Sequence, residues 1–341
     1  MNHKWKLCLL FILLFAVMTA IFAFFMFFFV FSMNIFYLVI FVWNLFLNGS
    51  QKFFIIFFQK IFSETYMADR EILLTNDDGF FAPGINALAQ LLREYGNVMV
   101  APSEVQSGAS ASFSMDRILR LRKTDEEESC VENGVRLGSI RKYTFTGTPV
   151  DCAKMGVNMF REEGRMPDFL ASGINHGSNA SAAAIYSGTL GATREGTIYG
   201  IPSVGFSIDS HDLSSDLSAV IEYSRKVLEN VFKYGISPGT FLNVNFPAVP
   251  KEQIRGFRFA TQGRGRWEKE FECRTDPRGR KYYWIVGTFM DMDDEAGERF
   301  GDGSSGDHKL LEKGWISICP MKIDATDYDE ISRLREAWHN D

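Results

Sequence analysis

Two adjacent carboxylates, Asp77 and Asp78, follow a short apolar run and stand just before a glycine. The run, residues 72–74, has the composition of a buried parallel strand, so both carboxylates would lie at its carboxyl end. In an open α/β sheet, ligands bind at that end, because the loops there expose backbone groups and helix N-termini. Two carboxylates at such a place favour a cation. A simple turn is the alternative reading, because Asn, Asp and Gly all favour turns.

Other polar, small-residue stretches downstream also follow predicted strands, and this favours the ligand site over the turn. Residues 102–110 contain the hydroxyl of Ser107, and residues 172–179 contain the amide of Asn175. With the two aspartates these groups form a set of hard oxygen donors, which suits Mg²⁺, Mn²⁺ or Ca²⁺ better than zinc. His176 lies in the second stretch, where it is either a hydrogen-bonding partner, the commoner role of a loop histidine, or a ligand.

A possible phosphate site follows at Ser187, Gly188 and Thr189, which we expect to open a helix reaching to about residue 200. The N–H groups and dipole of such a helix N-terminus attract an anion, and small side chains leave it accessible. A divalent ion beside a bound phosphate indicates metal-assisted hydrolysis of a phosphoester. One of the two aspartates would serve as the general base, and the sequence does not say which one.

The chain beyond residue 79 reads as alternating strands and helices. Thr148 and Pro149 have the residue types of an N-cap and a first helical position. Asp151 fits the first turn of that helix for dipole reasons and is not assigned to catalysis. Residues 117–122 alternate like a strand, and the acidic residues 125–128 are predicted to be a solvated hairpin tip.

Charge and cysteine content exclude several classes of protein. The net charge is −6; four lysines and one glutamate give the first 66 residues +3, which leaves −9 on the rest. Such an acidic body lacks the basic face of a general nucleic-acid binder, so we expect no duplex nucleic acid as a partner. The five cysteines are odd in number and form no C-x-x-C pair, which argues against a disulfide framework and for a reducing, cytoplasmic compartment.

The first 66 residues form a hydrophobic leader. No charged residue occurs from residue 7 to residue 51. This uncharged run is long enough for one tilted membrane span and a second, because a span needs about 20 apolar residues. A membrane anchor, with the rest of the chain in the cytoplasm, is one interpretation. The other is a start placed too early: Met67 precedes the first strand, and Phe- and Lys-rich sequence is what an AT-rich non-coding stretch gives when translated.

Several ordered segments resemble the SurE survival-protein family of metal-dependent 5′/3′-nucleotidases. They are LLTNDDGFFAPGI, APSEVQSGAS, FTGTPVDC, SGINHGSN and IYSGTLGA, followed by LNVNFP and TDPRGRKYYW. The resemblance covers about residue 72 to the C-terminus. It implies a single nucleotidase domain, residues 67–341, with a Rossmann-like three-layer α/β sandwich and a sheet dominated by parallel strands.

The same resemblance implies the roles of individual residues. Asp77, Asp78, Ser107 and Asn175 match the family's ligands for one divalent ion per subunit, Mg²⁺ or Mn²⁺. Residues matching positions near the bound phosphate are Asn76, Gly108, Ser187, Gly188 and Thr189. The implied activity is hydrolysis of nucleoside 5′- and 3′-monophosphates, with polyphosphate as a possible further substrate.

The resemblance also implies a homodimer or homotetramer whose C-terminal arms, within residues 250–341, exchange between subunits. Segments 256–260, 282–289 and 315–320 are candidates for that arm. The sequence departs from the family pattern at Gly306, which stands where a threonine commonly precedes the aspartate, here Asp307.

Other classes fit the residues less well. A haloacid-dehalogenase phosphatase needs Asp-x-Asp, whereas Asp77 and Asp78 are adjacent, and the sequence has no P-loop motif. The alternative from another functional class is a non-catalytic nucleotide- or metal-binding regulatory protein, which the leader could tether to a membrane. Metal-dependent release of phosphate would discriminate between that protein and a nucleotidase.

Overall fold

The computed structural model describes residues 70–102, 105–132, 135–293 and 305–338. The chain divides into two compact units, Met1–Tyr66 and Met67–Asp341. The first unit, and with it the hydrophobic leader predicted for residues 1–66, lies outside the described residues. Among the helices that are described, none is long and apolar enough to cross a membrane.

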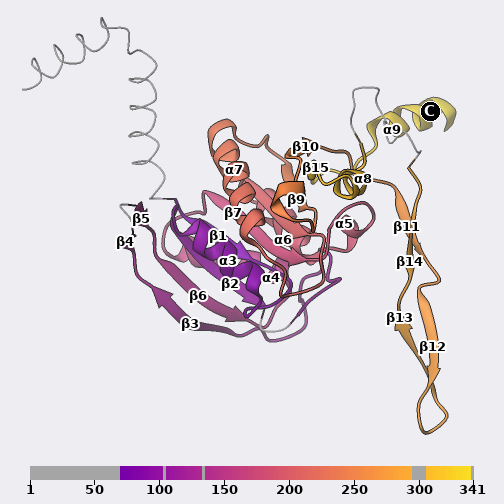
Figure 1. Cartoon of the computed structure of the whole chain (residues 1–341), viewed down its shortest axis with the longest axis horizontal. Coiled ribbons are helices and arrows are strands. Elements are labelled where there is room, and N and C mark those ends of the chain that lie inside the picture. Colours follow the sequence, from indigo (N-terminus) through magenta and orange to yellow (C-terminus); the bar gives the residue numbers. More distant parts are fainter. Residues whose placement is uncertain (1–69, 103–104, 133–134, 294–304, 339–341) are drawn as a thin grey trace, which may run out of the picture. The chain divides into compact units, whose positions relative to one another are not determined.

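A nine-stranded sheet forms the centre of the second unit (Figure 1), in the order β10-β15-β9-β8-β7-β1-β2-β6-β3. Its six middle strands run parallel, whereas β3 and β15 are antiparallel to their neighbours β6 and β9. The parallel strands are β1 (Ile72–Thr75), β2 (Asn97–Pro102), β6 (Ile140–Phe145), β7 (Phe169–His176), β8 (Ser203–Ile208) and β9 (Thr240–Phe246). The outer strands are β3 (Leu121–Glu127), β10 (Phe257–Phe259) and β15 (Ile316–Lys322).

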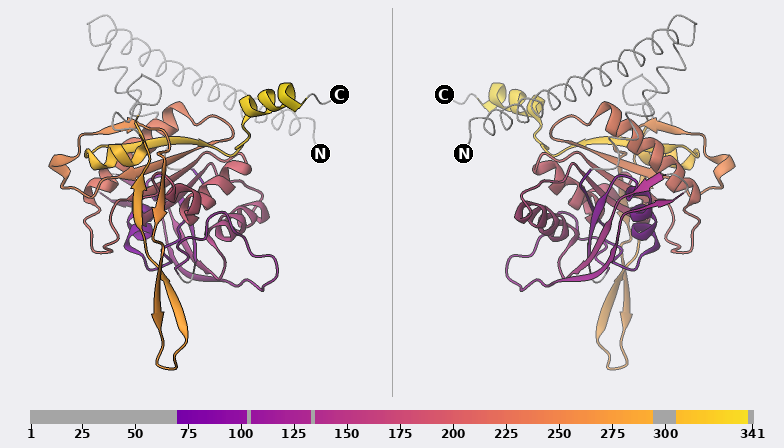
Figure 2. Two further views of the ribbon diagram at one scale, coloured as in Figure 1. Left: turned by 90° about the vertical axis from the view of Figure 1, so that its right-hand side faces the viewer. Right: turned by 90° about the vertical axis from the view of Figure 1, so that its left-hand side faces the viewer.

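Helices cover both faces of the sheet, as Figure 2 shows from the side. Side chains along β1 alternate between the two faces: Ile72 and Leu74 pack in the core with α3 (Pro83–Leu92) and α7 (Ser218–Tyr234). Leu73 points the other way, into the core with α4 (Pro149–Glu162) and α6 (Gly188–Ile198). These three layers confirm the predicted Rossmann-like sandwich.

The strand order reverses at β1. The chain proceeds from β1 to β2 and β6 on one side, and from β7 to β8 and β9 on the other. In open α/β sheets, ligands bind outside the carboxyl ends of the strands at this switch point. The predicted site residues Asp77, Asp78 and Asn175 occupy the ends of β1 and β7, so the topology brings them to the same crevice.

The remaining described elements lie outside these layers. They are β4 (Cys130–Glu132), β5 (Val135–Leu137), α5 (Ala183–Tyr186), the 3-10 turn Lys251–Gln253, α8 (Asp307–Glu312) and α9 (Tyr328–Trp338). The four cysteines among the described residues are free.

A long arm of two paired hairpin segments extends from the body (Figure 1). Strand β11 (Gly265–Glu268) pairs with β14 (Thr288–Asp291), and β12 (Phe271–Thr275) pairs with β13 (Lys281–Ile285). Of the three candidate segments only 282–289 lies in this arm. The assignments of 256–260 and 315–320 were wrong, because these residues form β10 and β15 at the edge of the central sheet.

The prediction for the acidic run was also wrong. Asp125 and Glu127 lie within the edge strand β3, not at a hairpin tip. The strand tolerates them because Glu127 forms ion pairs with Arg93, at 3.0 Å from Nη1, and with Lys142 of β6.

Helix α4 begins as predicted, at a capping box. The Asp151 backbone N–H donates to Thr148 Oγ1 at 3.1 Å, and the Thr148 backbone N–H donates to Asp151 Oδ2 at 2.9 Å. Asp151 also accepts hydrogen bonds from the backbone and the hydroxyl of Ser114. Its carboxylate is fully engaged in structure, which agrees with leaving it out of catalysis.

Removing the N-cap hydroxyl should destabilise the fold. Because Thr148 Oγ1 accepts from the first turn of α4, we expect Thr148→Ala to lower the free energy of unfolding by about 1–2 kcal/mol. Thr148→Ser keeps the hydroxyl and should remain within about 0.5 kcal/mol of the wild type. Urea denaturation of both variants provides the measurement. Equal losses in the two variants would contradict the capping role.

Candidate metal and phosphate site

Asp77 joins strand β1 to helix α6. Its Oδ1 accepts a hydrogen bond from Thr189 Oγ1 at 2.6 Å, and its Oδ2 accepts one from the Thr189 backbone N–H at 3.1 Å. Thr189 is the second residue of α6, so the carboxylate lies against the positive end of the helix dipole. Burial raises the pKa of Asp77 to about 6; the charge of Asp78 adds to the effect, and the bonds from Thr189 oppose it.

Asp78 is held from the neighbouring strand. The backbone N–H of His176, the last residue of β7, donates to Asp78 Oδ2 at 2.9 Å, and the ring Nδ1 lies 3.4 Å from the same oxygen. The imidazole is thus a hydrogen-bonding partner of a predicted ligand. This is the first of the two roles considered for it from the sequence.

Neither aspartate is paired with a lysine or an arginine of the described residues. Two carboxylates so placed, one of them 3 % exposed, require a counter-charge, because a buried charge without a partner is costly. A divalent cation would provide it.

Two asparagines supply the oxygens that complete such a site. Asn76 is fully buried, and its Nδ2 donates to the Gly79 carbonyl at 3.0 Å while its Oδ1 has no partner. Asn175 Nδ2 donates to the Gly177 carbonyl at 2.6 Å, which leaves its Oδ1 available. Amide oxygens with the NH₂ group already engaged are acceptors. The residues therefore fit a hard cation, and Asn76 Oδ1 suits the cation better than a phosphate oxygen.

The loop carrying Ser107 and Gly108 lies over the end of β1. The Gln106 backbone N–H donates to the Asp77 carbonyl at 2.8 Å, and the Ser110 backbone N–H donates to the Tyr186 carbonyl at 3.0 Å. Ser107 and Gly108 lie between these two contacts and are exposed. No hydrogen bond among the described residues joins Ser107 to the aspartates; the backbone of Gln106 is what ties the loop to the end of β1.

The N-terminus of α6 is the anion-binding side of the site. Ser187 is the N-cap, and its Oγ accepts from the Leu190 backbone N–H at 3.1 Å. A Cβ atom on Gly188 would lie 3.0 Å from Asp77 Oδ2, so glycine lets the helix begin directly against the carboxylate. The first-turn N–H groups of Thr189 and Leu190 are engaged by Asp77 and Ser187, so the Gly188 N–H and the helix dipole are what an anion beside the cation ligands would meet.

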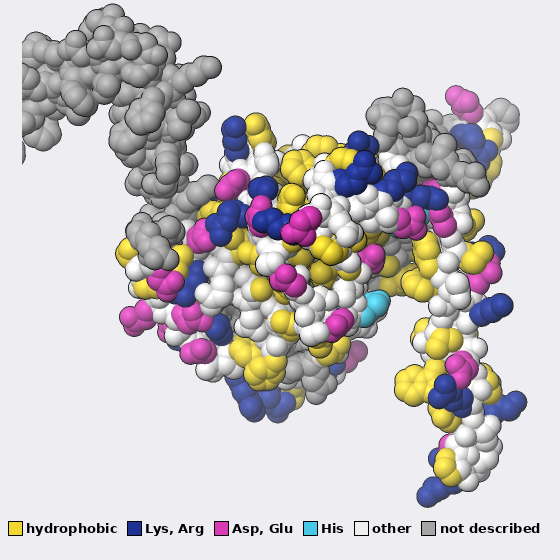
Figure 3. Space-filling model, viewed as in Figure 1, with side chains coloured by type: hydrophobic (Ala, Val, Ile, Leu, Met, Phe, Trp, Pro, Cys, Tyr) yellow, Lys and Arg dark blue, Asp and Glu magenta, His cyan; other side chains and the backbone are white. Residues whose placement is uncertain are grey.

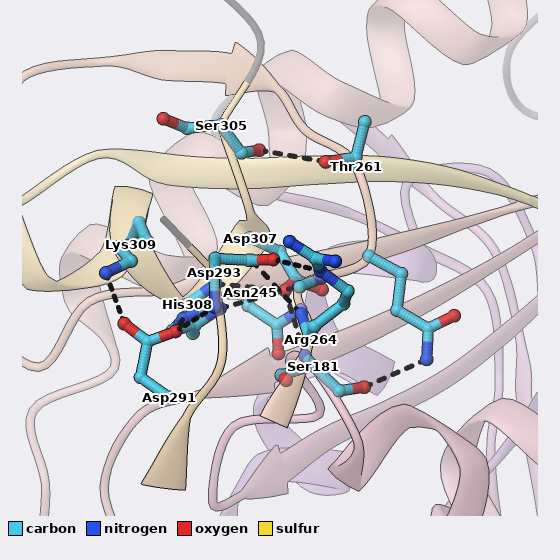
Figure 4. Close-up of polar contacts among 12 residues, drawn as sticks. Ser181, Asn245, Thr261, Arg264, Asp291, Asp293, Ser305, Asp307, His308 and Lys309 are labelled. Carbon is cyan, nitrogen blue, oxygen red and sulfur yellow. Dashed lines mark hydrogen bonds and ion pairs between the residues drawn. The ribbon is translucent and has the colours of Figure 1, made fainter. Parts of the chain in front are cut away.

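Sequence reasoning missed a second polar cluster, at the base of the arm (Figure 4). Ligand atoms of Asp291, Asp293 and His308 all lie within 4.8 Å of one another, a geometry that could hold a metal ion. Each carboxylate already has a cationic partner, however: Lys309 pairs with Asp291, and Arg264 Nε lies 3.0 Å from Asp293 Oδ1. His308 Nε2 also lies 3.0 Å from Asp291 Oδ1. We interpret the cluster as an ion-pair network that fixes the arm.

The departure at Gly306 is explained by this cluster. A Cβ atom on Gly306 would lie 2.6 Å from Asp293 Oδ2, so a threonine would displace that carboxylate. Asp307 remains in place, and its Oδ1 accepts backbone N–H bonds from Ser181 at 2.9 Å and from Gly263 at 3.0 Å. The sequence does not predict this network, because its members come from three separate places: the residue before β11, the end of β14 with the residues after it, and α8.

The fold is that of an α/β protein in which two aspartates and a helix N-terminus meet at the switch point of a mostly parallel sheet. A family model described as "Survival protein SurE" matches residues 72–269. The chain belongs to the SurE family, and the resemblance predicted from the motifs is confirmed.

Relatives with a known name are similar in sequence to most of this chain. The 5′-nucleotidase SurE of Christiangramia forsetii is 37% identical over 271 residues, which cover 79% of this chain and 97% of the relative. The 5′-nucleotidase SurE of Flavobacterium psychrophilum is 37% identical over 264 residues, covering 77% and 95%. The crystal structure of the SurE protein from Aquifex aeolicus superposes with a TM-score of 0.63 at 32% identity, covering 79% of this chain and 99% of that one.

The buried charge of Asp77 should make the metal-free protein sensitive to pH. Its folded-state pKa, about 6, lies above the ordinary value of 3.8, so this group's contribution to stability is complete below about pH 4 and is lost as the pH rises through 6. We expect Asp77→Asn to be more stable than the wild type at pH 7.5, by up to about 3 kcal/mol, and nearly equal to it at pH 4. Urea denaturation in EDTA at both pH values measures this. A variant that is less stable at pH 7.5 would contradict the assignment.

Proposed function

We propose that the chain is a metal-dependent 5′-nucleotidase, a phosphoric monoester hydrolase that converts nucleoside 5′-monophosphates to nucleoside and phosphate. The observation that carries the proposal is the pair of aspartates, which form no ion pair with a lysine or arginine of the described residues and are set against the N-terminus of α6. The names of the SurE relatives support it. Asp77, Asp78, Ser107 and Asn175 would hold one Mg²⁺ or Mn²⁺, with Asn76 Oδ1 as a further oxygen donor beside it.

Each residue has a distinct part in this reaction. The metal, when bound, would polarise a phosphoryl oxygen and stabilise the negative charge of the leaving group. The Ser187-Gly188-Thr189 turn, with Gly108 in the loop above it, would face the remaining phosphate oxygens and bind them through the Gly188 and Gly108 backbone N–H groups and the dipole of α6. Thr189 keeps Asp77 in place, and one of the two aspartates accepts the proton of the attacking water.

The substrate range follows from what the site contacts. Backbone N–H groups and a cation recognise a phosphoryl group rather than a particular base. The proposal therefore includes nucleoside 3′-monophosphates and the terminal group of polyphosphate as further substrates. A cytoplasmic location remains a prediction from the cysteine content.

Phosphate release from a panel of nucleoside 5′- and 3′-monophosphates tests the function directly. We expect the full-length protein to release phosphate, EDTA to abolish the release, and Mg²⁺ or Mn²⁺ to restore it. Asp77→Asn should lose activity by at least about a hundredfold, because a ligand of the cation is removed, while remaining folded. A folded, metal-binding protein that releases no phosphate would favour the regulatory-protein alternative.

We also propose a homodimer or homotetramer assembled through the arm. Hydrophobic side chains lie exposed along it (Figure 3), among them Phe271 at 67% and Ile285 at 77%. These two face each other across β12 and β13 and so share one face of the hairpin. A two-stranded hairpin is marginal in water by itself, so this apolar face favours cover by a second copy of the chain.

Polar substitutions on the arm should therefore weaken the assembly. We expect the double variant Phe271→Ser/Ile285→Ser to shift the mass measured by light scattering toward the monomer, because apolar area that the second copy would cover is lost. Val131→Ser provides the control, since Val131 is similarly exposed, at 69%, on the separate hairpin of β4 and β5. An unchanged mass for the arm variant would contradict an interface at this face.

A further inference from the structure

His176 places a buried imidazole against one of the proposed metal ligands. Its side chain is 2% exposed, and both its backbone N–H and its ring Nδ1 face Asp78 Oδ2, at 2.9 and 3.4 Å. The residue ends β7, and the next backbone N–H, that of Gly177, donates to the Ile208 carbonyl of β8 at 2.9 Å. The ring is therefore held by the sheet and not by a loose loop.

The tautomer is assigned from the chemistry of the contact, in which Nδ1 lies 3.4 Å from the carboxylate oxygen. An ionised carboxylate only accepts hydrogen bonds, so the proton of a neutral imidazole must lie on Nδ1 and point to Asp78. Two donors then converge on Oδ2. Among the described residues no hydrogen bond reaches Asp78 Oδ1, so this oxygen keeps its lone pairs for a cation.

The other ring nitrogen indicates that stability is not the reason for a histidine here. His176 Nε2 is buried and has no hydrogen-bond partner. A buried polar atom without a partner costs free energy, and an apolar side chain of similar size would avoid that cost. One ring nitrogen of His176 has a hydrogen-bond partner and the other has none. The contact of Nδ1 with Asp78, a proposed metal ligand, explains the histidine better than stability does.

We propose that His176 is a positioning residue for the metal site. Its Nδ1–H restrains the Asp78 carboxylate so that Oδ1 faces the cation, and removal of this donor weakens metal binding without removing a ligand. Such indirect contacts typically change metal affinity 10- to 100-fold. The inference rests on the proposed function, because it takes Asp78 as a ligand.

Mn²⁺ binding to the full-length, metal-free protein tests the inference without reference to turnover. Free Mn²⁺ is followed by electron paramagnetic resonance during titration of the wild type and of three variants. His176→Asn places an amide N–H near the position of Nδ1 and should bind Mn²⁺ within about threefold of the wild type. His176→Gln, which carries its donor one bond further out, and His176→Leu, which has none, should bind at least about tenfold more weakly.

The pattern among the variants separates positioning from a merely structural role. Unchanged affinity in His176→Leu, or equal losses in the Asn and Gln variants, would overturn the inference. Thermal unfolding of the metal-free proteins identifies any variant that fails to fold, and the two amide variants are closely matched in polarity. A folded wild type that binds no Mn²⁺ would instead overturn the proposed metal site itself, and the positioning role with it.

Discussion

The contact between the Asp77 carboxylate and Thr189 is the constraint on which the rest of the site depends. It joins the end of β1 to the start of α6 across 112 residues of sequence, through bonds of 2.6 and 3.1 Å. The same contact keeps a charge buried, which opposes folding whenever no cation is bound. A bound metal would thus stabilise the fold as well as take part in the reaction. Functional sites commonly contain such locally unfavourable features.

The arm and the site are connected through the loop after β7. Asp307, beside the ion-pair cluster of the arm, accepts the backbone N–H of Ser181. Two residues earlier, the backbone N–H of Asn179 donates to Asn245 Oδ1 of β9 at 2.7 Å. Because that loop also follows Asn175 and His176, the arm and the predicted metal ligands share one polar scaffold. Assembly through the arm would therefore affect the positions of the predicted metal ligands.

Local signals in the sequence predicted much of the fold and of the site. Thr148 and Pro149 predicted the start of α4, because helix capping depends on residues that are neighbours in sequence. The apolar run followed by Asp77 and Asp78 predicted the end of β1. Long-range partners could not be predicted in this way. The acidic residues of β3 depend on Arg93 and Lys142. Strand β15 depends on pairing with β9, and β10 depends on pairing with β15. The cluster around Asp291 and His308 likewise depends on contacts between separate elements.

The central claim is that the carboxyl end of β1 binds the divalent cation used in phosphoester hydrolysis. Anomalous diffraction from crystals grown with Mn²⁺ tests it most directly, because the signal locates the ion without reference to activity. We expect a peak at about 2.0–2.3 Å from carboxylate oxygens of Asp77 and Asp78, with the amide oxygen of Asn175 as a further ligand. A peak found only between Asp291, Asp293 and His308, with none beside β1, would contradict it.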